Sequence, residues 1–185
     1  KRQEVLEIKN VDIGKPGHNE LLVKNLSIGI NYIDTYHRSG LYPIPLPSGI
    51  GLEACSIIEE VGSEVKLFKV GDRVTRASMP IGAYSEKQII PEDKLVKVPD
   101  NISDEVASCI TLKGITAEYL LHRTYQVKKG DKILYHAAAG ALGQIFCPWA
   151  NALGAEIIGT VGSDEKIEIA KKNGCHHVIN YNEKN

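Results

Sequence analysis

The C-terminal third of the chain alternates between short apolar runs and amphipathic helical patterns, and this alternation constrains the fold more than any other feature. Three runs have the length and composition of buried strands: 132–137, 156–161 and 177–181. Between the first two, hydrophobic residues recur on one helical face over 142–153. Gly154 and Gly174 are predicted to end the two intervening helices, and Ser163 to cap the second of them. This β-α-β-α-β pattern predicts a parallel sheet with right-handed crossovers.

A glycine-containing turn, Gly140-Ala141-Leu142-Gly143, lies between the first strand and the first helix of this pattern. Glycines at such a turn let the backbone approach a phosphate, and the helix N-terminus offers free N–H groups and a partial positive charge. The turn is a degraded form of the G-x-G-x-x-G fingerprint, and a structural turn without a ligand is the alternative. Its place inside a βαβαβ unit favours dinucleotide binding, although only the first half of a dinucleotide-binding sheet is present.

The end of the second predicted strand indicates which dinucleotide is bound. Sites for NAD usually place an acidic residue there, where it binds the ribose 2′-hydroxyl. This chain has small residues at 159–163 instead, which leave room for a 2′-phosphate that Lys166 could neutralise. Asp164 is an acid close by, but a first-turn helix acid is its simpler role. The sequence therefore favours NADPH.

The first hundred residues predict a mainly-β region. Short strands broken by Gly and Pro are typical of a small barrel or sandwich. Strands are expected at 5–8, 21–30, 55–61, 84–90 and 95–98, with a further strand after the turn at 70–74. The proline-rich segment 41–51 is expected to be a loop. Ser103 is predicted to cap a helix that runs towards Ser108, and 116–125 is predicted to be a second helix.

Composition excludes several function classes. The chain has 185 residues with 22 Lys+Arg against 23 Asp+Glu, so nothing in its net charge supports binding to nucleic acid or to an anionic membrane. The uncharged stretch 133–155 changes pattern midway, which favours a strand, turn and helix over a membrane span. The four cysteines are scattered and no secretory signal is seen, so we expect reduced thiols and a cytoplasmic protein.

Several motifs together resemble one known family. They are 29–36, Arg38-Ser39-Gly40-Leu41-Tyr42-Pro43, Gly71-Asp72-Arg73-Val74, 112–117, 136–143 and 159–162. The chain resembles the zinc-free medium-chain dehydrogenase/reductase family, in its zeta-crystallin-like NADPH:quinone oxidoreductase group. That resemblance implies an α/β plus mainly-β fold: a GroES-like β-barrel catalytic domain at 1–111, then the first half of a Rossmann NADPH-binding domain at 112–185. It also implies that the chain lacks a short N-terminal and a long C-terminal part.

The resemblance assigns the cleft near the nicotinamide and the substrate. It implies catalytic roles for Asn31, Tyr36, Tyr42 and Thr116. Asn31, Asp34, Tyr36 and Thr116 would also contact the cofactor, as would Tyr119. Locally, Asp34 could instead be a helix-capping acid, and Tyr36 and Tyr119 could be amphipathic packing residues.

The resemblance also assigns the phosphate contacts of NADPH. Gly140, Ala141, Leu142 and Gly143 would hold the pyrophosphate. Gly162, Ser163, Lys166 and Tyr181 would surround the adenosine phosphate. Three residues depart from the family pattern: Ala141 replaces a glycine, Asn151 replaces a common basic residue, and Pro148 lies deep in a predicted helix, where it should kink the helix or displace its start.

No metal site is expected. The zinc-dependent members of the family have a Cys where this chain has Asn31, and a Gly-His-Glu where it has Gly51-Leu52-Glu53. Amide and aliphatic side chains cannot replace thiolate and imidazole ligands. The cysteines of a structural zinc lobe are also missing between Val74 and Ser103. His176 and His177 are expected to lie in a loop that precedes a strand.

The resemblance implies NADPH-dependent quinone reduction by hydride or electron transfer, without zinc, in a protein that is a homodimer at full length and has no membrane partner. The proton donor stays open between Tyr36 and water. One alternative is reduction of the C=C bond of enones, alkenals or enoyl thioesters. Another is a non-enzymatic structural or RNA-binding role, to which the near-neutral charge gives no support.

Overall fold

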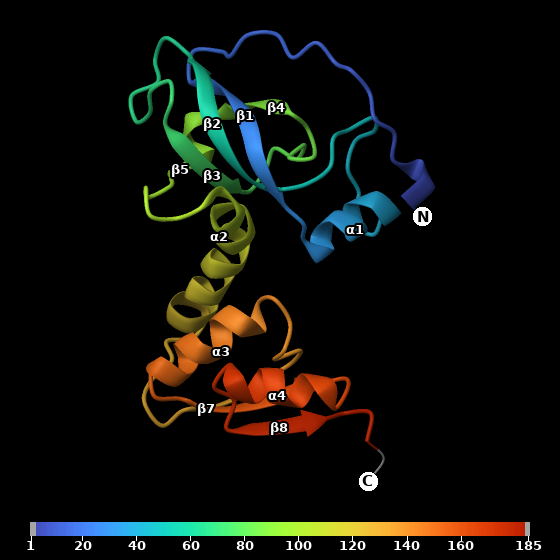
Figure 1. The fold of residues 1–185 in the computed structure, drawn as a ribbon, viewed down its shortest axis with the longest axis vertical. Coiled ribbons are helices and arrows are strands. Elements are labelled where there is room, and N and C mark those ends of the chain that lie inside the picture. Colours follow the sequence, from blue (N-terminus) through green and yellow to red (C-terminus); the bar gives the residue numbers. More distant parts are fainter. Residues whose placement is uncertain (1–2, 184–185) are drawn as a thin grey trace. The chain divides into compact units, whose positions relative to one another are not determined.

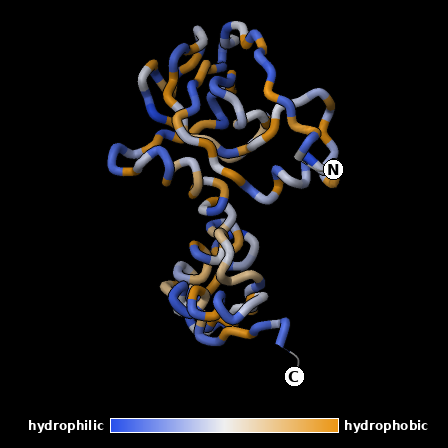
Figure 2. The backbone as a smooth tube through the Cα atoms, turned by 45° about the vertical axis from the view of Figure 1, so that its right-hand side comes forward, coloured by the Kyte–Doolittle hydropathy of each residue, from blue (hydrophilic) through white to orange (hydrophobic). Residues whose placement is uncertain are grey.

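The chain divides into two compact units, Lys1–Leu112 and Lys113–Asn185, in a computed structural model that describes residues 3–183 (Figure 1). In each unit, hydrophobic and hydrophilic stretches alternate along the backbone, as elements with one buried face require (Figure 2). The catalytic and NADPH-binding roles assigned to the two predicted domains remain predictions.

An antiparallel sheet of five strands forms the first unit, in the order β4-β1-β2-β3-β5. The strands are β1 (Glu20–Gly29), β2 (Glu53–Val61), β3 (Arg73–Ala77), β4 (Lys87–Pro91) and β5 (Val96–Lys97). Leu21, Val23, Ile58, Val74, Ile90 and Leu95 form its buried apolar cluster. Over the described residues this sheet is open, so the barrel expected from the sequence is not closed here. Mixed α/β architecture with an antiparallel and a parallel sheet confirms the predicted fold class.

Helix α1 (Tyr32–Ser39) follows β1 and ends at Gly40. Gly40 has a φ of 82°, and its amide donates to the carbonyls of Tyr36 and His37, which is the left-handed termination that glycine favours. The loop 41–51 then leads to β2, as its prolines predict. Short 3-10 turns lie at Gln3–Val5 and Glu92–Lys94.

Two expectations for the first hundred and twenty residues were wrong. No strand forms at 5–8, because this segment finds no strand to pair with in the described sheet. The two predicted helices are one helix, α2 (Asp104–Tyr119), which continues into a π-helical turn at Leu120–Thr124. Gly114 lies inside α2, since one glycine costs a helix only about 1 kcal/mol. The Ser103 cap is confirmed: its hydroxyl accepts from the Val106 amide at 3.3 Å.

The second unit contains the predicted parallel sheet, in the order β6-β7-β8. Its elements are β6 (Lys132–Tyr135), α3 (Gly143–Ala152), β7 (Glu156–Val161), α4 (Glu165–Lys172) and β8 (His177–Asn180). Helices α3 and α4 lie on one face of the sheet (Figure 1) and share with it one apolar cluster that includes Phe146, Ile157 and Ala170. Gly154 and Gly174 end the two helices with φ near 90°, as predicted.

The uncharged stretch 133–155 is therefore a strand, a turn and a short helix. Pro148 lies within α3, which begins at Gly143 and continues past it. No helix in the described part of the chain is long and apolar enough to cross a membrane.

Candidate functional site

Asn31 caps α1 and connects it to the sheet. It lies between β1 and α1, and its side-chain amide donates to Glu53 Oε2 at 2.8 Å. Glu53 begins β2 and is fully buried, and its other oxygen accepts from the Leu112 amide at 2.7 Å. A buried carboxylate with directed donors on both oxygens holds its surroundings in one arrangement. Asn31 is thereby fixed between the sheet and α1.

Asp34 is a predicted site residue that is buried and accepts two hydrogen bonds. It is 3% exposed, and its Oδ2 accepts from the Asn31 amide at 2.9 Å, which makes it a capping acid for α1. The same oxygen accepts from the Tyr84 hydroxyl at 2.9 Å. Oδ1 is buried and has no hydrogen-bond partner among the described residues. An unpaired buried carboxylate oxygen is rare in folded proteins, so it marks a place where a ligand could bind.

Tyr36 and Tyr42 lie together at the C-terminal end of α1 and in the loop that follows it. Their ring centroids are 5.2 Å apart, and Tyr32 packs edge-on against Tyr36 at 5.4 Å. Tyr36 is half-buried on α1, whereas Tyr42 is 49% exposed in the following loop. Partly exposed aromatic rings that pack edge-on and tilted against one another offer a surface on which a flat ligand can pack.

The glycine turn after β6 is shaped for close backbone approach. A Cβ at Gly143 would lie 2.4 Å from the Ala138 carbonyl oxygen, so only glycine fits there. Ala137 has a φ of 56° and occupies the left-handed region at the start of the turn. The Gly140 amide donates back to the Ala137 carbonyl at 2.8 Å. This turn precedes the N-terminus of α3, where the helix dipole favours an anion.

A second turn lies at the end of the neighbouring strand β7. The carboxyl ends of adjacent parallel strands meet at one edge of a sheet, which is where α/β proteins bind nucleotides. A Cβ at Gly162 would lie 2.5 Å from the Tyr181 hydroxyl, so the phenol covers this glycine. Asn182 adds a hydrogen bond of 2.8 Å to the Gly162 carbonyl. Gly162 and Tyr181, 19 positions apart in the sequence, are thus brought together.

Ser163 and Lys166 lie in the segment that connects β7 to β8. Lys166 is exposed on α4, and no acid occupies the end of β7. The Ser163 prediction needs one correction, because its side chain does not cap α4; the N-cap position is Asp164. The helix starts with a tight turn in which the Lys166 amide donates to the Ser163 carbonyl, and Asp164 accepts from Asn180 instead.

Thr116 and Tyr119 lie about one turn apart on α2, within the second unit. Thr116 is half-buried and Tyr119 is 41% exposed. The predicted site residues therefore fall into separate groups: Asn31, Asp34, Tyr36 and Tyr42 around α1; Gly140, Ala141, Leu142 and Gly143 after β6; Gly162, Ser163, Lys166 and Tyr181 around β7 and β8; and Thr116 and Tyr119 on α2.

Zinc does not fit the residues present. At the positions that match zinc ligands in the resemblance, the Asn31 amide is hydrogen-bonded to Glu53, and Leu52 has no ligating atom. No group of three or more His, Cys, Asp or Glu side chains in residues 3–183 could hold a metal ion. His176 accepts from the Ile157 amide and His177 pairs with Glu156, so both imidazoles have protein partners.

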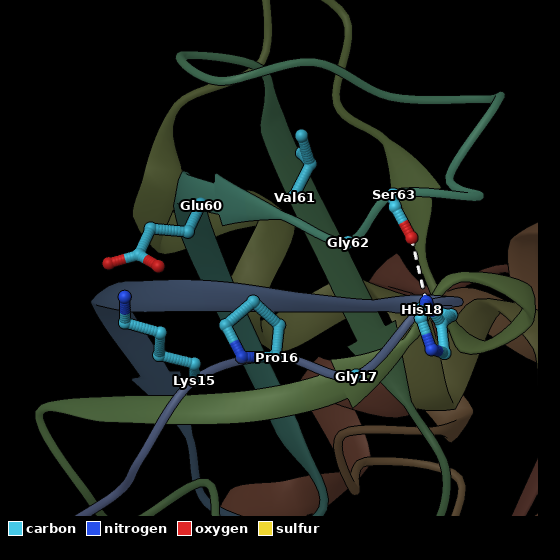
Figure 3. Close-up of a pocket in the computed structure, with 8 residues that line it drawn as sticks. All are labelled: Lys15, Pro16, Gly17, His18, Glu60, Val61, Gly62 and Ser63. Carbon is cyan, nitrogen blue, oxygen red and sulfur yellow. Dashed lines mark hydrogen bonds between the residues drawn. The ribbon is translucent and has the colours of Figure 1, made fainter.

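A pocket of about 350 Å³ lies elsewhere on the first unit (Figure 3). Lys15 and Glu60 are at one end of it, and His18 forms a hydrogen bond of 2.7 Å with Ser63 at the other. None of the predicted site residues lines this pocket.

The sequence did not predict two residues that form hydrogen bonds with the α1 group, Glu53 and Tyr84. Glu53 is in the Gly51-Leu52-Glu53 motif, whose sequence gives no sign of a hydrogen bond to Asn31, 22 positions away. Tyr84 gave no local signal, because it is 50 residues from Asp34.

Comparison with known proteins identifies the family. Residues 17–100 match the model of the alcohol dehydrogenase GroES-like domain, and residues 141–185 match that of zinc-binding dehydrogenase. The chain is 51% identical to quinone oxidoreductase of Pseudomonas aeruginosa, over 98% of the chain and 56% of that protein. It is 49% identical to 2-haloacrylate reductase of a Burkholderia species, over 94% of the chain and 54% of that protein.

Comparison with a solved structure supports the same family. The chain is 51% identical to Escherichia coli quinone oxidoreductase complexed with NADPH, with a TM-score of 0.90, over 97% of the chain and 55% of that structure. The chain spans about half the length of the curated relatives it matches. With both family models in sequence order and about half of all residues shared with quinone oxidoreductases, the chain belongs to the medium-chain dehydrogenase/reductase family.

Proposed function

We propose that the protein reduces quinones with NADPH and without zinc. The observation that carries the proposal is identity of about half the residues to quinone oxidoreductases over nearly the whole chain. The reaction is NADPH + H⁺ + quinone giving NADP⁺ + quinol. When bound, NADPH supplies the hydride, and the protein supplies binding, orientation and a shielded pocket.

The phosphates of NADPH fit the second unit. Gly140 and Ala141 are exposed just before the N-terminus of α3, and Gly143 lets the turn pack closely on the Ala138 backbone, where a Cβ would clash. The acid-free end of β7 leaves space for a 2′-phosphate, for which Lys166 is the proposed cation and Gly162, Ser163 and Tyr181 the proposed neighbours. Thr116 and Tyr119 are further proposed cofactor contacts on α2.

The reacting groups are proposed to bind at the α1 group. Asn31 and Asp34 are held by buried hydrogen bonds, so the buried Asp34 Oδ1, which has no partner among residues 3–183, would orient a ligand without rearrangement of the site. Tyr36 and Tyr42 present ring faces and hydroxyls to a flat quinone. Tyr36 and water are the two proposed sources of the proton that completes the quinol.

A second function is favoured by one observation. The 2-haloacrylate reductase relative is named for an alkene substrate in which a carboxylate activates the C=C bond. Hydride delivery to a quinone and to an activated alkene need the same donor and differ in the acceptor, so the alternative is NADPH-dependent C=C reduction.

Two further properties are proposed for the whole protein. We propose a cytoplasmic location, which free thiols support: Cys55, Cys109, Cys147 and Cys175 are all unpaired. We also propose a homodimer at full length, as the family resemblance implies.

The test is an activity panel on the full-length protein. NADPH oxidation is followed with 1,4-naphthoquinone, with 2-chloroacrylate and with an alkenal, and each is repeated with NADH. We expect the highest kcat/KM for NADPH with the quinone. Turnover of 2-chloroacrylate alone would replace the proposal with C=C reduction, and no turnover of any acceptor would contradict both.

A further inference from the structure

We propose that Tyr84 is a positioning residue for this reaction: its hydroxyl fixes the Asp34 carboxylate, and through it the N-terminus of α1. The proposal rests on the proposed function of the α1 group. Tyr84 belongs to the segment 78–85 before β4, away from α1 in the sequence, and its hydroxyl donates to Asp34 Oδ2 at 2.9 Å.

The hydrogen bond has one direction at physiological pH. Burial and the neighbouring Asp34 carboxylate raise the pKa of Tyr84 to about 12. The phenol therefore keeps its proton and remains a donor. Because Oδ2 accepts from both the Tyr84 hydroxyl and the Asn31 backbone amide, the carboxylate is held in one orientation, and Oδ1 is left buried without a partner among residues 3–183.

The segment that carries Tyr84 is itself held from several sides. Arg76, which is 1% exposed, donates to the carbonyls of Leu52, Ser78 and Pro80, and also to Gln88. Asn25 donates to the carbonyls of Ala83 and Ser85 at 3.0 and 2.8 Å. So many side-chain bonds to one short segment leave Tyr84 little freedom, which a positioning group needs.

A glycine makes room for the Tyr84 ring. Gly51 has a φ of 93°, and a Cβ placed there would lie 2.3 Å from Tyr84 Cδ1. The Gly82 and Ala83 amides donate to the Gly51 carbonyl, and the Tyr84 amide donates to the Ile50 carbonyl. The segment 50–51 thus forms a backbone support for the ring on one side, while Asp34 receives the hydroxyl on the other.

The network gives Tyr84 a role in orientation. Asp34, which accepts from the Tyr84 hydroxyl, also accepts from the backbone amide of Asn31. The side-chain amide of Asn31 in turn donates to Glu53. Loss of the phenol hydroxyl would let the Asp34 side chain rotate and weaken the α1 cap. If the first turn of α1 moved, Asn31 and Tyr36 would no longer be oriented correctly relative to the reacting groups. Small misplacements of such residues reduce turnover strongly.

The experiment compares Tyr84→Phe with wild type in the full-length protein, and Tyr125→Phe is the matched control. Tyr125 is 60% exposed and lies outside the proposed site. Two readouts are taken: kcat and KM for NADPH with 1,4-naphthoquinone, and amide hydrogen exchange across residues 32–39. For Tyr84→Phe we expect about a tenfold lower kcat and exchange in α1 faster by about fivefold to tenfold.

Two further variants make the test specific. Asp34→Ala should lower kcat, and adding Tyr84→Phe to it should lower kcat no further, because the hydroxyl acts through the carboxylate. Gly51→Ala keeps the hydroxyl but displaces the ring, so it should change kcat and α1 exchange as Tyr84→Phe does.

The outcomes separate the two proposals. Unchanged α1 exchange in Tyr84→Phe overturns the role of Tyr84, as does unchanged kcat in a variant whose α1 exchange is faster. If wild type reduces no acceptor with NADPH, the proposed function fails, whereas α1 exchange still decides whether Tyr84 holds Asp34.

Discussion

The two units differ in the kinds of side chain that they bury. Buried polar residues of the described chain gather in the first unit, where Asn31, Asp34, Glu53, Ser56, Asp72, Thr75, Arg76 and Ser108 are all under one tenth exposed. Among the described residues of the second unit, Thr160 is the buried polar one, and the core of this unit is an apolar cluster. Hydrogen bonds therefore specify the arrangement of the first unit, and packing specifies that of the second.

The difference follows from the two sheets. A parallel sheet with helices on it buries apolar strands, and its turns can be read from glycines and helical periodicity. The antiparallel sheet of the first unit must in addition hold α1, α2 and long loops, and it does so through buried side-chain bonds. Substitutions should therefore act through cavities and backbone clashes in one unit and through unpaired polar atoms in the other.

The largest effect is expected from Phe146→Ala. Phe146 is 5% exposed and stacks on Tyr135 with centroids 4.3 Å apart. The variant should lower the free energy of unfolding by about 3–5 kcal/mol, as deletion of a buried aromatic ring leaves a cavity. Urea unfolding followed by the fluorescence of Trp149, which packs on this cluster, measures it. Ile169→Ala on the exposed face of α4 is the control, and an equal loss there would contradict the assignment of the core.

Glu53→Gln tests the hydrogen-bonded unit at nearly constant volume. One of the two donors on Glu53 would face the new amide N–H₂ group, so we expect a loss of about 2–3 kcal/mol in the free energy of unfolding. Hydrogen exchange of the β1 and β2 amides measures the loss. Glu59→Gln removes a partly exposed pair with Lys87 and should cost under about 1 kcal/mol. Equal losses in the two variants would show that the buried network does not set stability.

Gly143→Ala tests the backbone contact under the glycine turn. The added Cβ would meet the Ala138 carbonyl, so the helix and strand must separate, at a cost of roughly 1–3 kcal/mol in the free energy of unfolding. NADPH affinity should fall with it. Gly130→Ala, at a φ of 90° but with open space around its Cβ, separates backbone strain from the clash. If NADPH affinity fell equally in both variants, the turn would not be the phosphate site.

The smallest effect is the pH dependence of Asp72. Its hydrogen bond and ion pair with Lys97 at 2.9 Å, helped by the Lys69 amide, hold the pKa of Asp72 below its ordinary value. A lowered pKa in the folded state contributes stability above the unfolded-state pKa, and that contribution is lost as pH falls through the folded value. Asp72→Asn should therefore be less stable than wild type at neutral pH, and the difference should shrink on acidification. A difference that does not vary with pH would contradict this. Urea unfolding across the acid range measures it.

The sequence predicted the second unit well because its signals are local. Periodicity over 142–153 and the glycines at its ends suffice to place α3, and the neighbouring strands follow from apolar runs. The errors were also local: 5–8 has strand composition without a strand partner, and the two predicted helices are one helix, α2, with its π-helical continuation. Ser163 resembles a cap, but the chain enters α4 by a tight turn.

The first unit's site was predicted only in part. Asn31 and Asp34 are three positions apart, and their capping relation was within reach of the sequence. Glu53 meets Leu112 across 59 positions and Tyr84 meets Asp34 across 50. Such contacts depend on how strands and loops fold back, and no pattern in a single sequence records them. The roles assigned to these residues in the reaction remain predictions.

We propose that the full-length protein has an NADPH-specific reductase site, and cofactor binding tests this proposal most directly. The Kd values for NADPH and NADH are measured by fluorescence titration of full-length wild type, Lys166→Ala and the control Lys172→Ala, which changes a lysine near the far end of α4. We predict that wild type and the control prefer NADPH by about tenfold or more, and that Lys166→Ala loses most of this preference, as loss of a charge-assisted phosphate contact requires. Equal affinity for the two nucleotides in wild type, or a preference for NADH, would contradict the account.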